Sequence, residues 1–166
     1  MGDFESDKSS RKEWEDAYIK GLDLLGLNYK ERTNPFRGAS AASHPLLAES
    51  ATQFQATAFK ELLPASGPVR TIIMGDESPE KYARAGRVQE FMNFQLMNKM
   101  EDYTPEYDQM LFYLPLAGST FKKVYYDELM DRPVSKFVPA EDLVVNYMAT
   151  DLDGCERICH VINMSY

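Results

Sequence analysis

The chain has 166 residues, of which 44% are hydrophobic and 12% aromatic, and its formal net charge is −8. This length and apolar content predict a packed core in one domain, or in one lobe of something larger, and argue against global disorder. The acidic balance argues against a domain that binds nucleic acid through a basic face, although DNA can pass along an acidic surface without adhering to it. Residues 1–15 do not resemble a signal peptide, and no apolar run approaches the length of a membrane span. The two cysteines fit a reducing, cytosolic setting.

The N-terminal quarter predicts one helix between two irregular segments. Residues 1–10 are polar and are predicted to form a flexible lead-in to a single lobe that spans residues 11–166. A helix is predicted from Arg11 to Leu25, with Gly26 as its stop, and a loop from Asn28 to Ala42. The apolar positions of this helix fall three or four apart, at Trp14, Tyr18, Leu22 and Leu25.

A second helix is predicted to open at Ser43 and to end before Pro64. Its apolar stripe is Leu47, Ala51, Phe54, Ala58 and Leu62, widened by Phe59 and Leu63. Its other faces carry uncharged side chains, at Thr52, Gln53, Gln55 and Thr57. Two interpretations stay open for these faces, which either meet another protein surface or are ordinary solvated faces.

The segment Val69–Met74 predicts a short strand, and Ser78 and Pro79 predict the start of the longest helix, which reaches about Asp102. One stripe on this helix comprises Tyr82, Ala85, Val88, Met92, Leu96 and Met100, and a second comprises Phe91, Phe94 and Met97. Apolar residues on two sides predict a helix that is buried between layers or packs on a neighbouring subunit. The methionines are interpreted as core filler rather than as a flexible recognition groove.

The stretch Thr104–Asp127 reads as a helix, a glycine stop and a strand. Thr104 is predicted to cap the helix, with Pro105 at its first position and Gly118 at its end in a positive-φ conformation. Pro115 predicts either a kink or an early end. The strand Ser119–Tyr126 is expected to pair with Pro133–Val138 as an antiparallel hairpin.

Two more strands are predicted, at Leu143–Asn146 and at Glu156–Tyr166, on either side of an acidic turn. The expected fold is therefore α+β, with several amphipathic helices packed on a small, mostly antiparallel sheet. Because the last residues stop inside a strand pattern, the chain is expected to be part of a longer polypeptide.

The titratable residues do not form a recognisable catalytic motif. Cysteine and histidine are common zinc ligands, and Cys155, Cys159 and His160 lie close together in the sequence. Because no second pair of ligands accompanies them, we interpret the cysteines as buried small hydrophobic residues and His160 as a strand residue. His44 is expected to shape a helix start rather than to act as a general base.

Acidic residues gather near the C-terminus, at Glu141, Asp142, Asp151 and Asp153, and are interpreted as solvated turns. Lys122, Lys123 and Arg132 place positive charge around the hairpin but are too few for a basic patch. No catalytic, cofactor-binding or metal-binding residue is predicted, and the chain is not expected to be an enzyme. A small intracellular metal-dependent hydrolase that uses Asp142, Asp151, Asp153 and His160 is the alternative from another class, and a generic protein-interaction domain is a third.

A series of stretches carries more information than any single motif. In order, they are Trp14–Gly26 (WEDAYIKGLDLLG), Asn34–Ser40 (NPFRGAS), His44–Ala56 (HPLLAESATQFQA), Glu61–Thr71 (ELLPASGPVRT), Arg87–Gln95 (RVQEFMNFQ), Asp108–Asp127 (DQMLFYLPLAGSTFKKVYYD) and Phe137–Val145 (FVPAEDLVV). In this order and at this spacing, the series resembles the N-terminal part of portal proteins of tailed bacteriophages. The resemblance covers nearly the whole chain from residue 11 onward.

The resemblance implies a structural role. Portal proteins form a ring, usually of twelve subunits, at one vertex of the viral head, and the terminase motor pumps double-stranded DNA through that ring before the DNA leaves to the tail. The chain would correspond to the start of the outer wing, and its partners would be further copies of itself, terminase, capsid and tail proteins, and DNA that passes without tight binding. The expected location is the virion, and the host cytoplasm during assembly, with no membrane partner. Length is the departure, because no segment matches the later stem and clip of portal proteins.

Overall fold

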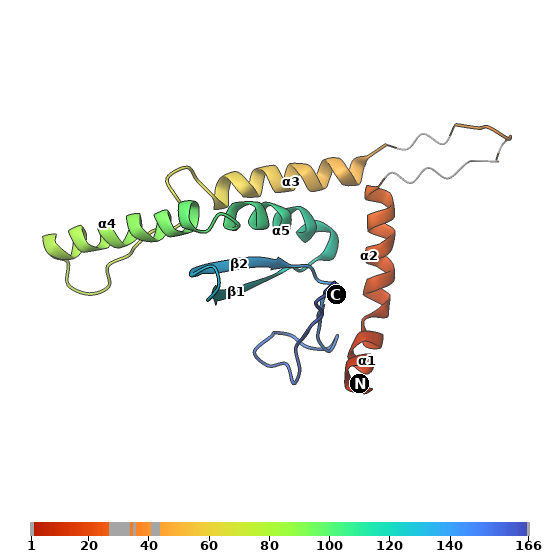
Figure 1. The fold of residues 1–166 in the computed structure, drawn as a ribbon. Coiled ribbons are helices and arrows are strands. Elements are labelled where there is room, and N and C mark those ends of the chain that lie inside the picture. The colour runs from red at the N-terminus through yellow and green to blue at the C-terminus, as the bar shows by residue number, and fades with distance from the viewer. Residues whose placement is uncertain (1, 27–33, 35, 41–43, 166) are drawn as a thin grey trace.

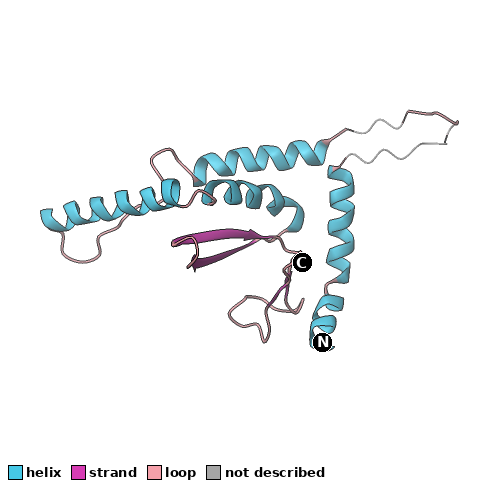
Figure 2. Cartoon of the chain, viewed as in Figure 1, coloured by secondary structure: helices cyan, strands magenta, loops and turns pink. Residues whose placement is uncertain are grey.

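The computed structural model describes residues 2–26, 34, 36–40 and 44–165. The helices are α1 (Gly2–Ser10), α2 (Lys12–Leu25), α3 (Leu46–Leu62), α4 (Pro79–Phe94) and α5 (Tyr103–Ala117), with a π-helical turn, η1 (Gln95–Lys99), after α4. The strands are β1 (Phe121–Asp127), β2 (Arg132–Val138), β3 (Leu143–Val144) and β4 (Cys159–His160). The predicted α+β class is confirmed, since helices pack on small antiparallel sheets (Figure 2).

The body of the molecule is layered around α5. Helix α3 runs along one side of α5, the hairpin of β1 and β2 packs on the other, and α2 stands across the end of both helices (Figure 1). Helix α4 extends beyond this body and shares no layer with it. The term "body" is used below for α1, α2, α3, α5 and the four strands.

The core of the body lies where α2 meets the end of α5. Tyr18, Ala117 and Ala140 are buried there, and Trp14 packs against them with its ring stacked on Tyr18 at a centroid distance of 5.3 Å. The indole Nε1 of Trp14 donates a hydrogen bond to the carbonyl oxygen of Ala117 at 2.9 Å. The helical spacing of the predicted Arg11–Leu25 segment therefore places its aromatic face on the last turn of α5.

Arg11 joins α2 to the loop before β3. Its side chain is buried, and its guanidinium donates to the carbonyl oxygens of Ala140 (2.9 Å), Leu143 (2.7 Å) and Glu141 (2.6 Å). Nε also bonds to Glu15 at 3.0 Å. A planar group with five N–H donors is suited to this task, because one side chain satisfies three backbone acceptors at once.

The N-terminal segment differs from the predicted flexible lead-in. Gly2–Ser10 forms helix α1, and Asp7 on this helix is buried, with an ion pair of 3.2 Å from its Oδ2 to Nε of Arg157. Apart from Phe4, the residues of α1 form no apolar stripe, so its order depends on this long-range contact, which local composition does not reveal.

The predicted start of the second helix, at Ser43, lies outside the described residues, and helix α3 runs from Leu46. The predicted end of the next helix needs correction. Helix α4 ends at Phe94 rather than near Asp102, because the hydrogen-bonding pattern changes to π-helical over Gln95–Lys99.

Helix α5 begins at Tyr103 with Asp102 as its N-cap, so Thr104 and Pro105 lie inside the first turn instead of at the cap and first position. The helix does not end early at Pro115 but continues to Ala117. Pro115 has no N–H to donate to the carbonyl oxygen of Leu111, yet the helix continues for two residues beyond it. Gly118 then adopts φ +80°, which confirms the predicted left-handed stop.

The hairpin is confirmed, with Phe121 opposite Val138 and Asp127 opposite Arg132. The other strand predictions were too long or wrong. The pair formed by β3 and β4 is only two residues long, so the predicted strands Leu143–Asn146 and Glu156–Tyr166 are mostly irregular where described. Val69–Met74 is extended but belongs to no sheet.

Candidate interaction surface

Residues 64–99, called the α4 arm below, project from the body (Figure 1). The chain leaves α3 at Pro64, runs outward to a turn at Gly75 (φ +87°), and returns as α4. Ser78 caps α4 by accepting a hydrogen bond from the backbone N–H of Lys81, and Pro79 occupies the first turn. The prediction of a helix start at Ser78 and Pro79 is therefore confirmed, and local capping is sufficient to account for it.

The segment of the arm that runs outward from α3 is held by side-chain amides of α4. Asn93 accepts from the backbone N–H of Val69 (2.9 Å) and donates to its carbonyl oxygen (3.1 Å), and Gln89 accepts from the N–H of Thr71 (3.2 Å). Thr71 Oγ1 donates to the carbonyl oxygen of Ala85 at 3.2 Å. Ala85, Gln89 and Asn93 lie four residues apart and so share one helix face. For Val69 and Thr71, these bonds take the place of a β-ladder, and Val69–Met74 does not form the predicted strand.

Gly67 allows this close approach. It has φ +93°, and a Cβ built there would lie 2.3 Å from Cγ of Asn93. Only glycine therefore permits both the left-handed backbone and the position of the Asn93 amide.

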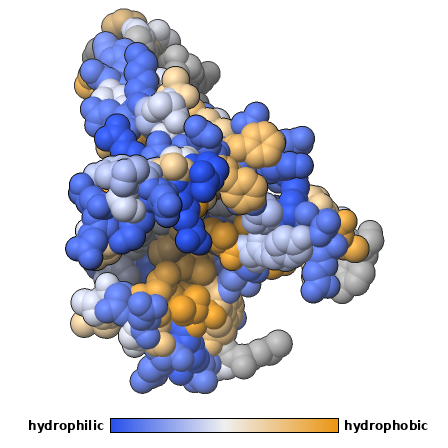
Figure 3. Space-filling view, turned by 90° about the vertical axis from the view of Figure 1, so that its left-hand side faces the viewer, coloured by the Kyte–Doolittle hydropathy of each residue, from blue (hydrophilic) through white to orange (hydrophobic). Residues whose placement is uncertain are grey.

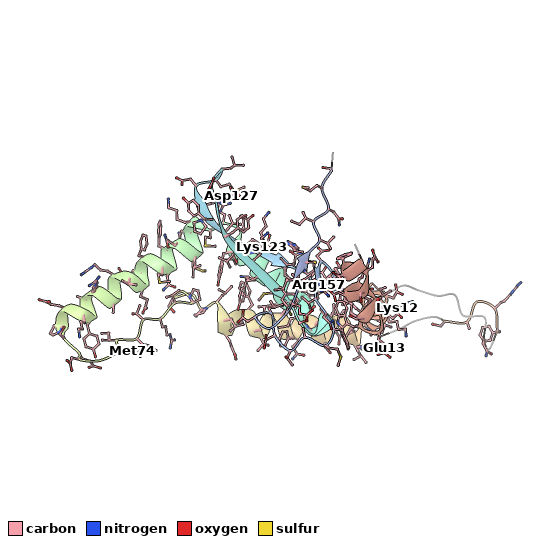
Figure 4. The ribbon with its side chains drawn as sticks, turned by 90° about the horizontal axis from the view of Figure 1, so that it is seen from below. Lys12, Glu13, Met74, Lys123, Asp127 and Arg157 are labelled. Atoms are coloured by element: carbon pink, nitrogen blue, oxygen red, sulfur yellow. The ribbon has the colours of Figure 1, made fainter. Side chains whose placement is uncertain are left out.

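The remaining faces of the arm leave apolar side chains in solvent. No residue of α4 is buried, and Phe91 is 60% exposed. The exposed large apolar side chains of the arm are Ile72, Met74, Tyr82, Val88, Phe91, Met92, Phe94 and Met97. Seen from below, side chains stand out along α4 with no element over them, and Met74 lies near its outer end (Figure 4). Scattered apolar residues are normal on a protein surface, whereas a group of exposed apolar residues on one projecting segment makes the arm a candidate interaction surface.

Figure 3 shows the molecule from the outer end of the arm, with orange apolar side chains among blue polar ones and the largest orange area in the lower half of the view. The sequence predicted that this helix is either buried between layers or packed on a neighbouring subunit. In the structure, the body does not cover the helix, so it is not buried between layers. The core-filler interpretation of the methionines holds for Met100, which is buried, and fails for Met92 and Met97, which are exposed.

The base of the arm is fixed to the body by polar contacts. Arg132 at the start of β2 donates to Asp102 Oδ2 (2.9 Å) and to the carbonyl oxygen of Lys99 (3.3 Å). Met100, which lies between Lys99 and Asp102 in the sequence, is buried. The arm is thus tied at its root, while its outer length relies on its own hydrogen bonds.

The uncharged side chains of α3 were predicted either to meet another protein surface or to form ordinary solvated faces, and the structure places them in different surroundings. Gln55 points inward, where its Nε2 donates to Asp108 Oδ1 of α5 at 2.7 Å. Thr52 and Gln53 remain exposed. The uncharged residues of α3 are thus used partly within the body itself.

The residues that the sequence singled out for chemistry are spread over the fold. Cys159 and His160 form β4, whereas Cys155 lies in the preceding loop, where its Sγ donates to the carbonyl oxygen of Asp151. Asp151 also accepts from the N–H of Gly154 in a turn. Across the residues that the structure describes, no three histidine, cysteine or acidic side chains are grouped to hold a metal ion. The hydrolase alternative, which needs Asp142, Asp151, Asp153 and His160 together, finds no support there, and His44 is an exposed residue before α3.

The three cationic residues of the hairpin face different ways. Lys122 turns toward α5, with its ammonium 4.2 Å from the ring centroid of Tyr103 and 4.3 Å from that of Tyr107. Burial lowers the pKa of this ammonium, and Glu106 partly opposes that shift. Arg132 is engaged by Asp102, and Lys123 lies on the opposite face of the hairpin from Lys122. They form no basic patch.

No known protein family and no characterised protein matches this sequence at a significant level. Within the described ranges, no helix is both long and apolar enough to cross a membrane.

Sequence reasoning identified the apolar stripes of α4 but missed how the arm is built. The signal was present in the polar residues, since Gln89 and Asn93 interrupt the stripes at a spacing of four. Amides at that spacing on a helix offer donors and acceptors to a chain that runs alongside. Arg11 was likewise read as the first residue of a helix, because its distant carbonyl partners leave no local pattern.

Proposed function

We propose that this chain is the outer-wing, N-terminal part of a portal-ring subunit, a structural protein of the head vertex through which DNA is packaged and ejected. The series of stretches from Trp14 to Val145 suggests the family, and the exposed α4 arm is the observation that carries the proposal. A ring subunit must present apolar surface that its own core does not use, and the arm presents such surface on a helix with no buried residue.

The proposed role also assigns partners. Further copies of the chain would cover the arm, while terminase, capsid and tail proteins would meet other parts of the assembled particle. Double-stranded DNA would pass through the ring without tight binding, which is compatible with a net charge of −8 because each phosphate contact has to be broken during transport. The protein would act in the virion, and in the host cytoplasm during assembly, and it would catalyse no reaction.

The test measures assembly mass by sedimentation velocity, on this chain and on the longest polypeptide that contains it. The variant Phe91→Glu/Phe94→Glu places two charges on the arm, and Leu129→Glu/Met130→Glu is the matched control, since both of these side chains are exposed at the hairpin turn. The proposal expects a closed ring from the longer polypeptide, which the arm variant disrupts and the control retains. A longer polypeptide that stays monomeric at every concentration would refute it.

The exposed arm also favours the second candidate, a protein-interaction domain that binds a different protein. The same measurement separates the two, because an interaction domain predicts a monomer whose arm is covered only when that other protein is added.

A further inference from the structure

A pocket of about 390 Å³ lies between the hairpin and the C-terminal segment, on the side of the hairpin that faces away from α5. Lys123, Tyr125 and Lys136 line it from the strands, and His160, Ile162 and Asn163 line it from the C-terminal segment. Its volume is within the range of sites that bind small molecules. In the view from below, Lys123 is placed midway along the hairpin ribbon (Figure 4).

Lys123 and Lys136 are directly opposite each other in the register of β1 and β2. Opposite residues in an antiparallel pair have Cβ atoms about 5 Å apart, and like charges in such a pair destabilise it. Neither ammonium has a carboxylate within ion-pair distance in the part of the chain described, and the ring of Tyr125 at 5.6 Å from Lys123 is the contact that is present. Within that part of the chain, no direct ion pair therefore offsets the repulsion between the two ammonium groups.

We propose that this pocket binds the phosphate group of a small organic phosphate such as a nucleotide. Two ammonium groups on adjacent strands can close on the same oxyanion, and a phosphate dianion matches their combined charge. His160 and the amide of Asn163 add donors at the other wall, while Asp142, which also lines the pocket, offsets part of the positive charge.

The walls favour an organic phosphate over the free ion. The ring of Tyr125 and the apolar side chains of Val138 and Ile162 line the same pocket, where they can contact a base or another apolar group. This inference goes beyond the proposed structural role and rests on neither the α4 arm nor the assembly.

The test is calorimetric titration of the chain with adenosine monophosphate, inorganic phosphate and adenosine at constant ionic strength. We expect the monophosphate to bind at least tenfold more tightly than inorganic phosphate and adenosine not to bind. Lys123→Gln and Lys136→Gln should each weaken binding at least tenfold. Lys12→Gln is the matched control, because Lys12 is exposed on α2 and its loss changes the net charge equally (Figure 4).

The melting temperature of each unliganded variant shows that lost binding is not lost folding. Removing one of two opposed charges should leave the melting temperature unchanged or raise it. The proposal is overturned if the monophosphate does not bind at millimolar concentration, or if Lys12→Gln weakens binding as much as the pocket variants do. The lysines would then serve to protect the edges of a two-stranded sheet. If inorganic phosphate binds as tightly as adenosine monophosphate, the proposal that the ligand is an organic phosphate is overturned.

Discussion

The body and the α4 arm both contain helices with apolar stripes, but only the helices of the body have buried residues. In the body, α2 lays Trp14 and Tyr18 on the end of α5, and Arg11 ties the same helix to the loop before β3. In the arm, α4 is capped at Ser78 and bonded along one face by Gln89 and Asn93, yet no residue of the helix is buried. Local hydrogen bonds therefore shape the helix of the arm, whereas burial of apolar side chains stabilises the helices of the body.

This difference shows which apolar helix face no other element of the described chain covers. Helix stability in proteins comes mostly from the packing of an apolar face, and marginal isolated helices fray. A helix that exposes Phe91, Met92 and Phe94 is expected to gain its stability from a partner surface. Changes in the body should consequently alter folding, whereas changes in the arm should alter association.

The largest effect on folding is expected from Arg11→Met. This change leaves three carbonyl oxygens without their donor and removes a buried cation, so we expect a loss of about 3 kcal/mol in the free energy of unfolding. Urea denaturation followed by circular dichroism measures it. The neighbouring exposed Lys12→Met is the control and should change stability by less than about 0.5 kcal/mol. Equal effects at both positions would show that the guanidinium does not hold α2 to the loop.

Gly118→Val should destabilise by about 1–3 kcal/mol, because a β-branched residue resists the left-handed conformation at the end of α5. No atom lies within 4 Å of a Cβ built there, so the cost is in the backbone alone. The arm supplies a contrast in Gly86→Ala, which also meets open space but at a helical position. That change should leave the global melting temperature the same or slightly higher. An unchanged melting temperature in Gly118→Val would contradict this account of the joint.

A smaller change in the stability of the body is expected at alkaline pH. Burial, together with the carboxylate of Glu141, raises the pKa of Tyr18 to about 12. The unfolded chain loses this proton near pH 10, before the folded chain does, so stability should fall as the pH rises from 10 toward 12. After allowance for partial solvent screening, Tyr18 accounts for about 1 kcal/mol of that fall.

Tyr18→Phe should flatten this part of the pH–stability curve, measured by urea denaturation at several pH values. Tyr82 on the arm is the control. A hydrogen bond to Glu77 raises its pKa, but its side chain is exposed, so Tyr82→Phe should leave the curve unchanged. Identical curves for the wild type and Tyr18→Phe would argue against burial of this hydroxyl.

The smallest effect on folding is expected within the arm. Asn93→Leu removes both bonds to Val69, which should speed amide hydrogen exchange in residues 69–72 without shifting the global unfolding transition. A matching loss of global stability would show that arm and body unfold as one unit.

The sequence was sufficient to predict the features that local patterns determine. The helix over residues 12–25, the cap at Ser78, the left-handed Gly118 and the pairing of the two hairpin strands all follow from periodicity, capping chemistry and turn residues. What it did not reveal depends on distant partners. Residues 2–10 are helical beside Arg157, and Val69–Met74 bonds to amides about twenty positions later.

The candidate surfaces show the same limit. Exposure of the α4 stripes cannot be read from periodicity, because an apolar stripe looks the same whether the chain covers it or not. The opposed pair Lys123 and Lys136 becomes visible only when the hairpin register is known residue by residue.

The most direct test of the central claim is hydrogen exchange of α4 at low and high protein concentration, in the longest polypeptide that contains the chain. The account predicts that amides of residues 83–94 exchange rapidly in the dilute monomer and become protected as the assembly forms, while those of α5 are protected throughout. Exchange of α4 that is equally fast in monomer and assembly, or already slow in the monomer, would contradict the claim that the arm is the assembly surface.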